Sequence, residues 1–201
     1  MSAPSHGDGM MRISRRYEPR LRLRDVPNVK QTAYHEAGHA VAGYKLHVPF
    51  RYVTIVPDEE QGSVGHVLYS ALRPDFDSAR DEMTEFRLRA MIEPRIICAL
   101  AGEAAESALT GRRHLPTATS DYCSAVDFAL VVTGGYPDEA GAYCTWLYYR
   151  VVGVVRNPLA WAAIEALAAA LPARERIGSR AARRIIKGAI CDEIETQRTV
   201  R

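Results

Sequence analysis

The chain has 201 residues, 47% of them hydrophobic, and a formal net charge of +2. These values fit one globular domain with a well-filled core and argue against a polyanionic partner for the body of the protein. The four cysteines form no C-x-x-C pair, which favours reduced thiols in a cytoplasmic protein. The sequence opens without a signal peptide's apolar stretch, and its most apolar run, residues 142–155, is short and contains Arg150. We therefore expect a soluble protein with no membrane span.

The N-terminal 26 residues are strongly basic. Between residues 12 and 24, six arginines stand against one glutamate. Such a segment is usually a solvated, flexible arm, although it can also dock on an acidic surface, a nucleic acid or an anionic lipid. No aromatic residues alternate with the arginines in the manner of a nucleic-acid site, so we expect no nucleic acid partner. The predicted organisation is a flexible arm over residues 1–26 and a single domain over residues 27–201.

The first half of the domain mixes helix and strand. A helix is expected over residues 28–46, followed by two strands, at residues 51–56 and 63–70, on either side of a polar turn. A long helical region is predicted from residue 77 to 109, with a break or restart near Pro94 because proline cannot donate its backbone nitrogen.

The second half reads as helical throughout. Hydrophobic periodicity predicts helices over residues 121–133, 139–155 and 159–171, and a final helix that begins at Ser179. The fold class expected for the whole domain is therefore mostly α with a small β-sheet.

One pentapeptide in the first helix carries the chemistry. Residues 35–39 read His-Glu-Ala-Gly-His, so His35 and His39 lie four residues apart on one helix face and can bind a single metal ion. Glu36 stands beside the first histidine, where its carboxylate can take a proton from an attacking water. Small and apolar residues surround the motif. A surface helix with two unrelated histidines would not have that context, because burying three polar side chains is costly without a metal or other partners.

A catalytic zinc needs a third protein ligand, which the fold must bring from elsewhere. Asp121 is attractive because a carboxylate is stabilised at a helix N-terminus, yet a simple N-terminal helix charge explains it equally well from spacing alone. The side chains able to serve are His47, His66, Glu103, Glu106, His114, Asp121, Cys123 and Asp127.

Several segments together resemble the peptidase domain of FtsH-type ATP-dependent zinc metalloproteases. Residues 34–41 look like the zinc helix of that family, and residues 53–57 followed by Gly65 look like its next strand pair. Residues 101–106 are similar to the family's G-R-A-A-E-E helix, and residues 117–121 to its T-G-A-S-N-D segment. The resemblance implies an FtsH-like zinc-peptidase fold with the HExxH motif on the first core helix.

The resemblance also implies the roles of individual residues. It makes His35, His39 and Asp121 the zinc ligands and Glu36 the catalytic base. The chain departs from the family at Glu103, which stands where the family has arginine, and in lacking a G-x-x-x-x-G-K-[ST] nucleotide loop. What remains looks like the peptidase module without its ATPase.

Three further residues are candidates for the surroundings of the site. Glu106 can accept a hydrogen bond from a ligand imidazole, although a surface acid near a helix end explains it as well. Gly65 and His66 belong to the strand that flanks the substrate in the family, but a histidine on a strand is more often simply exposed. On the helix of Asp121, we expect Cys123 to be a small core residue and Asp127 to be solvated or close to the ligands.

The leading hypothesis is a zinc-dependent endopeptidase that cleaves flexible or unfolded polypeptides without ATP. A separate ATPase acting as unfoldase, or further copies of the chain, are the partners that this hypothesis admits. One alternative is a non-catalytic zinc-binding module that regulates or adapts a partner. Another is a repressor-cleaving protease of the ImmA/IrrE kind, which predicts a glutamate as third ligand.

Overall fold

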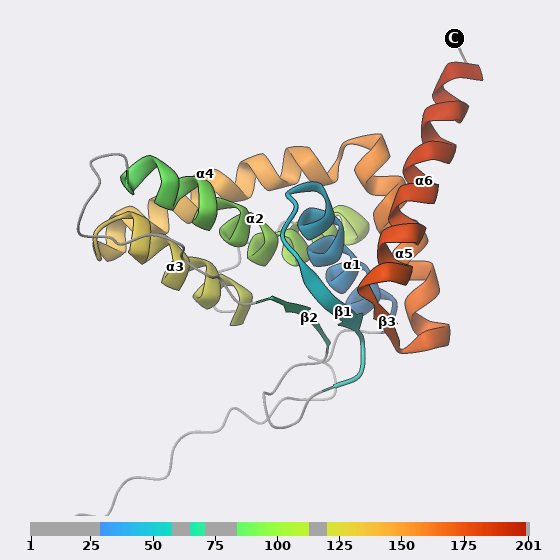
Figure 1. Cartoon of the computed structure of the whole chain (residues 1–201), viewed down its shortest axis with the longest axis horizontal. Helices are drawn as coiled ribbons and strands as arrows, with labels where there is room; N and C mark the ends of the chain where they lie inside the picture. Colours follow the sequence, from blue (N-terminus) through green and yellow to red (C-terminus); the bar gives the residue numbers. More distant parts are fainter. Residues whose placement is uncertain (1–28, 58–64, 71–83, 113–119, 200–201) are drawn as a thin grey trace, which may run out of the picture.

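A computed structural model describes residues 29–57, 65–70, 84–112 and 120–199 of the chain. Six helices and a three-stranded antiparallel sheet make up these residues, so the prediction of a mostly α fold with a small sheet is confirmed (Figure 1). The basic arm of residues 1–26 lies outside the described residues. The elements are α1 (Val29–Lys45), β1 (Phe50–Thr54), β2 (His66–Tyr69), α2 (Thr84–Thr110), α3 (Ser120–Val132), α4 (Pro137–Val155), α5 (Pro158–Arg174), β3 (Arg176–Gly178) and α6 (Ser179–Thr199).

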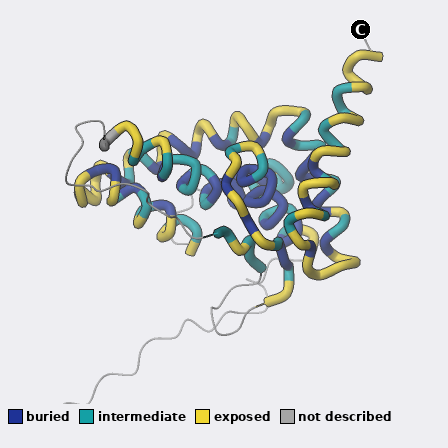
Figure 2. Tube along the Cα trace, in the orientation of Figure 1, coloured by how far each residue is buried: buried dark blue, intermediate teal, exposed yellow. Residues whose placement is uncertain are grey.

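Helix α1 lies at the centre of the molecule and is buried along most of its length (Figure 2). It packs against α2, α5 and the sheet. Small residues allow the close contact with α2: a Cβ atom built on Gly38 would lie 2.5 Å from the carbonyl oxygen of Ala101 and 2.7 Å from the Cβ of Ala105. A larger residue at position 38 would therefore force the two helices apart.

The sheet has the strand order β2-β1-β3, which leaves β2 at an edge. Val53 of β1 is fully buried, and the hydroxyl of Tyr69 in β2 donates a hydrogen bond to the carbonyl oxygen of His39, 2.7 Å away. The edge strand is thereby tied to the middle of α1. The third strand, β3, was not expected from the sequence. It has three residues, too few to show an alternating pattern, and the preceding Glu175 adopts a positive φ of 57°.

The predicted break near Pro94 was wrong. Helix α2 runs without interruption through this residue. Proline removes one backbone hydrogen bond and crowds the preceding turn. Here Ile92 and Ile96, on either side of it, are both buried, so tertiary packing of the two flanking turns compensates for the local cost. Residues 77–83, where this helix was expected to begin, lie outside the described residues.

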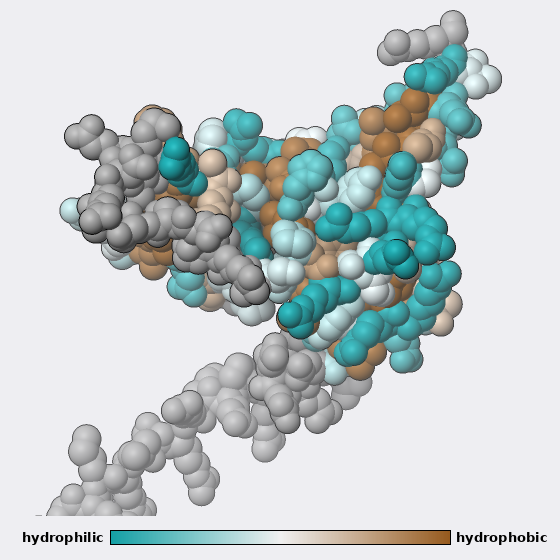
Figure 3. Space-filling model, viewed as in Figure 1, coloured by the Kyte–Doolittle hydropathy of each residue, from teal (hydrophilic) through white to brown (hydrophobic). Residues whose placement is uncertain are grey.

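The remaining helices follow the predicted pattern closely. Gly134 and Gly135 have positive φ values of 62° and 85° and end α3, and Asn157 caps α5 by accepting a hydrogen bond from the backbone nitrogen of Leu159. Helix α6 is strongly amphipathic, and its C-terminal part projects from the body with hydrophobic residues along one side (Figure 3).

No single helix of the described residues is long and apolar enough to cross a membrane. Helices α4 and α5 reach that length and composition only together, across a bend of 82°.

Candidate metal centre

The two histidines of α1 lie side by side, as their four-residue spacing predicts. Their ring centroids are 4.7 Å apart, and the rings meet edge to face. His39 is 5% exposed and Glu36 only 3%, whereas His35 is partly exposed. Of the two imidazoles, that of His35 is therefore the more exposed.

Asp121, in the first turn of α3, meets both histidines. Its Oδ2 atom lies 2.9 Å from Nε2 of His35 and 3.1 Å from Nε2 of His39. Ligand atoms bound to one tetrahedral zinc ion at 2.0–2.2 Å are separated by about 3.3 Å, so these distances are close to the edges of a zinc coordination shell. The two imidazoles and the carboxylate form a group able to hold a metal ion, and the donors match the preference of zinc for nitrogen and oxygen ligands.

The charges of this cluster are strongly coupled. Burial lowers the pKa of His35, but hydrogen bonds to Asp121 and Glu106 outweigh that effect and raise it to about 10. Burial likewise lowers the pKa of His39, and the charge of Asp121 turns the balance to a raised value. For Asp121 burial raises the pKa, but His39 and His35 bring it well below its usual range. In the metal-free protein, protonated histidine is thus favoured, and its positive charge stabilises the carboxylate of Asp121.

Each imidazole is held by its other nitrogen. Nδ1 of His39 donates to the carbonyl oxygen of Cys98 at 2.7 Å, which leaves the lone pair of Nε2 free to point at a metal. Nδ1 of His35 lies 3.3 Å from Oε2 of Glu106. The structure thus places Glu106 where a carboxylate can orient a ligand histidine. Glu103, the residue that differs from the family pattern, is buried nearby and forms a second group with His35 and Glu106.

Gly102 is a residue of this site that the sequence analysis missed. A Cβ atom added to it would collide with Nε2 of His39 and would lie 2.6 Å from Nε2 of His35. The backbone of α2 therefore lies directly against the two imidazole nitrogens, and a side chain at position 102 would occupy the space beside them. A glycine in the interior of a predicted apolar helix is the signal that could have marked it.

Glu36 is a buried carboxylate with one oxygen unsatisfied. No hydrogen-bond partner for Oε2 lies among the described residues. Burial raises the pKa of Glu36 to about 7, against the lowering effect of His39 and His35. The position of Gly65 also matters here, because a Cβ atom on this residue would lie 3.0 Å from Oε1 of Glu36. The backbone directly before β2 thus lies against the carboxylate.

The other candidate side chains lie apart from this cluster. His66 contacts Tyr52 instead, with Nε2 3.1 Å from the tyrosine hydroxyl. The expectation that Cys123 is a core residue was wrong: the buried stripe of α3 is made by Ala125, Ala129 and Val132, and Cys123 and Asp127 lie on its exposed side. His47 occupies a turn with a φ of 58°, and His114 lies outside the described residues.

Two curated proteins, both zinc metalloproteases, show a distant sequence relationship to this chain. The chain is 38% identical over 77 residues to the ATP-dependent zinc metalloprotease FtsH of Acholeplasma laidlawii. It is 31% identical over 122 residues to the ATP-dependent zinc metalloprotease YME1L1 of Rattus norvegicus.

The matches cover only part of each protein. They include 37% and 58% of this chain, but 11% of the FtsH protein and 16% of YME1L1. No protein-family model matches the chain. The comparisons therefore support a distant relationship to these metalloproteases. They do not extend to the full length of either relative.

Proposed function

We propose that the protein is a zinc-dependent endopeptidase that hydrolyses peptide bonds in flexible or unfolded polypeptides. One observation carries the proposal. Oδ2 of Asp121 lies 2.9 Å from Nε2 of His35 and 3.1 Å from Nε2 of His39, and the carboxylate of Glu36 is buried beside them. A purely structural zinc site has four protein ligands and no need of a base. Three ligands beside Glu36 instead favour catalysis over a regulatory zinc module.

The residues divide the chemistry between them. His35, His39 and Asp121 would hold the zinc, which when bound polarises the scissile carbonyl and makes water more acidic. Glu36 takes the proton from the attacking water and then delivers it to the leaving amine. In the metal-free chain, burial raises the pKa of Glu36 to about 7, whereas a cation bound beside it would favour the carboxylate that accepts the proton.

The third ligand distinguishes this proposal from a protease of the ImmA/IrrE kind. Asp121 contacts the inner nitrogens of both histidines, whereas Glu106 bonds the far nitrogen of His35. A glutamate in that position orients a ligand and does not complete the ligand set. The geometry therefore favours His-His-Asp coordination.

The edge strand is the proposed substrate site. Strand β2 lies at the end of the described sheet, and Gly65, the residue directly before it, lies against Glu36. An extended peptide that pairs with this edge would use main-chain hydrogen bonds, which select little for side chains. We infer broad specificity for polypeptide that is already unfolded. Folded targets would need a separate ATPase as unfoldase, and the proposed setting of the reaction is the cytoplasm.

Replacing Glu36 by glutamine tests the mechanism. The amide keeps the shape of the side chain but cannot accept the proton, so cleavage of a casein-type substrate without ATP should fall by about 10²–10⁴-fold. Zinc content, measured by atomic emission on the purified protein, should stay at one per chain. Glu195→Gln, an exposed change of the same chemistry on α6, should cleave like the wild type. Unchanged cleavage by Glu36→Gln would refute the assigned base. A zinc-loaded wild type with no cleavage would favour the non-catalytic alternative.

A further inference from the structure

Helix α4 has an outward face that the fold does not explain. Its inward residues pack in the core, yet Trp146 is 49% exposed and Tyr149 is 61% exposed. The helix runs along one long side of the molecule with exposed positions along its outer surface (Figures 1 and 2). Large aromatic side chains that lie exposed beside one another commonly mark an interaction surface.

The exposed positions share one side of the helix. They recur at spacings of three and four residues, which brings them into a single stripe. We call this stripe the α4 face; it consists of Glu139, Ala142, Trp146, Tyr149, Arg150 and Gly153. The guanidinium of Arg150 lies 5.0 Å from the ring centroid of Trp146, which in turn stacks on Tyr143 at 5.9 Å. Tryptophan, tyrosine and arginine are the residues that contribute most to protein interfaces.

The charges of the α4 face are separated along its length. Asp138 and Glu139 stand at the N-terminal end, and Arg150 stands three helical turns further on. A second α4 in antiparallel orientation would bring Glu139 of each copy to Arg150 of the other. A parallel copy would instead set like charges together. The face is therefore complementary to itself through a two-fold axis.

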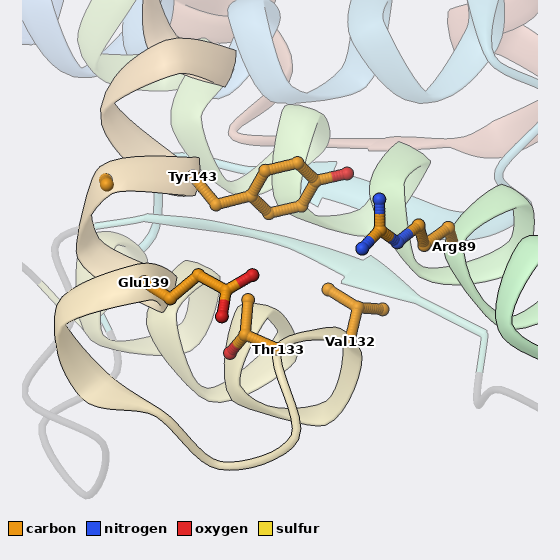
Figure 4. A pocket seen from close by; sticks show the side chains of 6 residues that line it. Arg89, Val132, Thr133, Glu139 and Tyr143 are labelled. Carbon is orange, nitrogen blue, oxygen red and sulfur yellow. The ribbon is translucent and has the colours of Figure 1, made fainter.

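A small cavity adds an independent element of self-complementarity. It has a volume of about 170 Å³ and is lined from three elements: Arg89 of α2, Val132 and Thr133 at the end of α3, and Glu139, Ala142 and Tyr143 of α4 (Figure 4). The cavity thus borders the N-terminal half of the α4 face. In the antiparallel arrangement, this half faces Trp146 and Arg150 of the second copy, so that a projecting side chain meets a hollow.

We propose that two copies of this chain associate through the α4 face in an antiparallel, two-fold symmetric dimer. The large aromatic residues of each copy cover the small residues and the cavity of the other, and two Glu139–Arg150 pairs fix the orientation. Because the metal centre is not part of this face, the dimer does not depend on the proposed peptidase activity, and its test needs no substrate.

Sedimentation velocity of the full chain over a range of concentrations tests the association. The wild type should be dimeric, and Trp146→Glu should raise the dimer dissociation constant by roughly thirtyfold or more, the effect of losing an interface hot spot. Val29→Glu is the matched control: it puts the same charge on an apolar side chain that is 59% exposed on α1, and it should leave the dimer intact. Circular dichroism and zinc content establish that each variant is folded.

Charge exchange tests the orientation. Glu139→Arg and Arg150→Glu should each weaken the dimer by about tenfold, and the double variant should recover most of the loss, because it restores two opposite-charge contacts. A wild type that stays monomeric at all concentrations overturns the proposal, as does an oligomer that Trp146→Glu leaves unchanged. Failure of the double variant to recover overturns the antiparallel pairing. Trp146-dependent binding to another protein, without self-association, would assign the α4 face to that partner instead.

Discussion

The α1–α2 contact and the α4 face use opposite kinds of residue. At the α1–α2 contact, Gly38 and Gly102 bring two helix backbones so close that an added Cβ would collide with the other helix or with the ligand histidines. On the α4 face, large aromatic residues project into solvent, and an added Cβ at Gly153 would meet nothing within 4 Å. Contacts within the chain account for the residues of the first region. Contacts with a second copy would account for those of the α4 face.

This difference indicates which positions can accept a larger side chain. At the metal centre the available space is the critical property, since two imidazoles and a carboxylate must meet above a backbone without a side chain. On the α4 face the monomer imposes no such limit, so apolar residues there cost solubility without a packing gain. Substitutions at the metal centre should accordingly weaken zinc binding, whereas substitutions on the α4 face should leave it unaffected.

The largest effect should come from Gly102→Ala. The new methyl group would displace Nε2 of both His35 and His39, so we expect zinc affinity to fall on the order of 1,000-fold, beyond the 10–100-fold typical of outer-shell changes. Competition titration with a chromophoric chelator measures it. Gly188→Ala in α6 is the matched control, because its added Cβ meets nothing within 4 Å. That control should bind zinc normally and gain about 0.5–1 kcal/mol of stability. Normal zinc binding by Gly102→Ala would contradict the proposed position of the metal.

A smaller effect is expected for Asp121→Asn. The amide keeps an oxygen in place but loses the negative charge that both histidines face, so zinc affinity should fall on the order of 100-fold. Asp127→Asn makes the same change at an exposed position six residues along α3 and should bind zinc like the wild type. Equal affinities of the two variants would remove Asp121 from the ligand set and reopen the choice among the other carboxylates.

The smallest effect concerns the pH dependence of the metal-free protein. The raised pKa of His35, about 10 against an ordinary 6.5, stabilises the fold fully below pH 6.5, and this stabilisation is lost as pH rises toward 10. The pKa of Glu36, raised from 4.5 to about 7, acts in the same direction between those values. The melting temperature of the metal-free chain should thus fall by on the order of 5 °C between pH 6 and pH 10.

Saturating zinc should reverse this trend, because zinc replaces the protons and its ligands must be deprotonated. The metal-free Asp121→Asn variant should show a weaker pH dependence, since the partner that holds the proton is gone. A melting temperature that rises with pH in the metal-free wild type would contradict the assigned charge states.

Much of the fold follows from local patterns. Periodic hydrophobic residues and glycine stops predicted all six helices, and β-branched residues predicted the first two strands. The errors share one cause, which is that tertiary contacts override local preference. Pro94 stays helical because both flanking turns are buried, β3 forms because β1 offers it a partner, and Cys123 is exposed because Ala125 and Ala129 face the core.

By itself, the sequence determined the part of the metal centre that depends on helix geometry. Four residues make slightly more than one helical turn, so His35 and His39 share a face whatever surrounds them. Asp121 lies 86 residues from His35, and no local rule connects the two; the resemblance to a family supplied it, and the packing of α3 on α2 brings it within 2.9 Å. Only the tertiary structure decided the close approach of Gly102 to the two imidazoles, the contact of Gly65 with Glu36 and the exposure of the α4 face. These properties depend on which surfaces meet, and that is set by the packing of the whole domain.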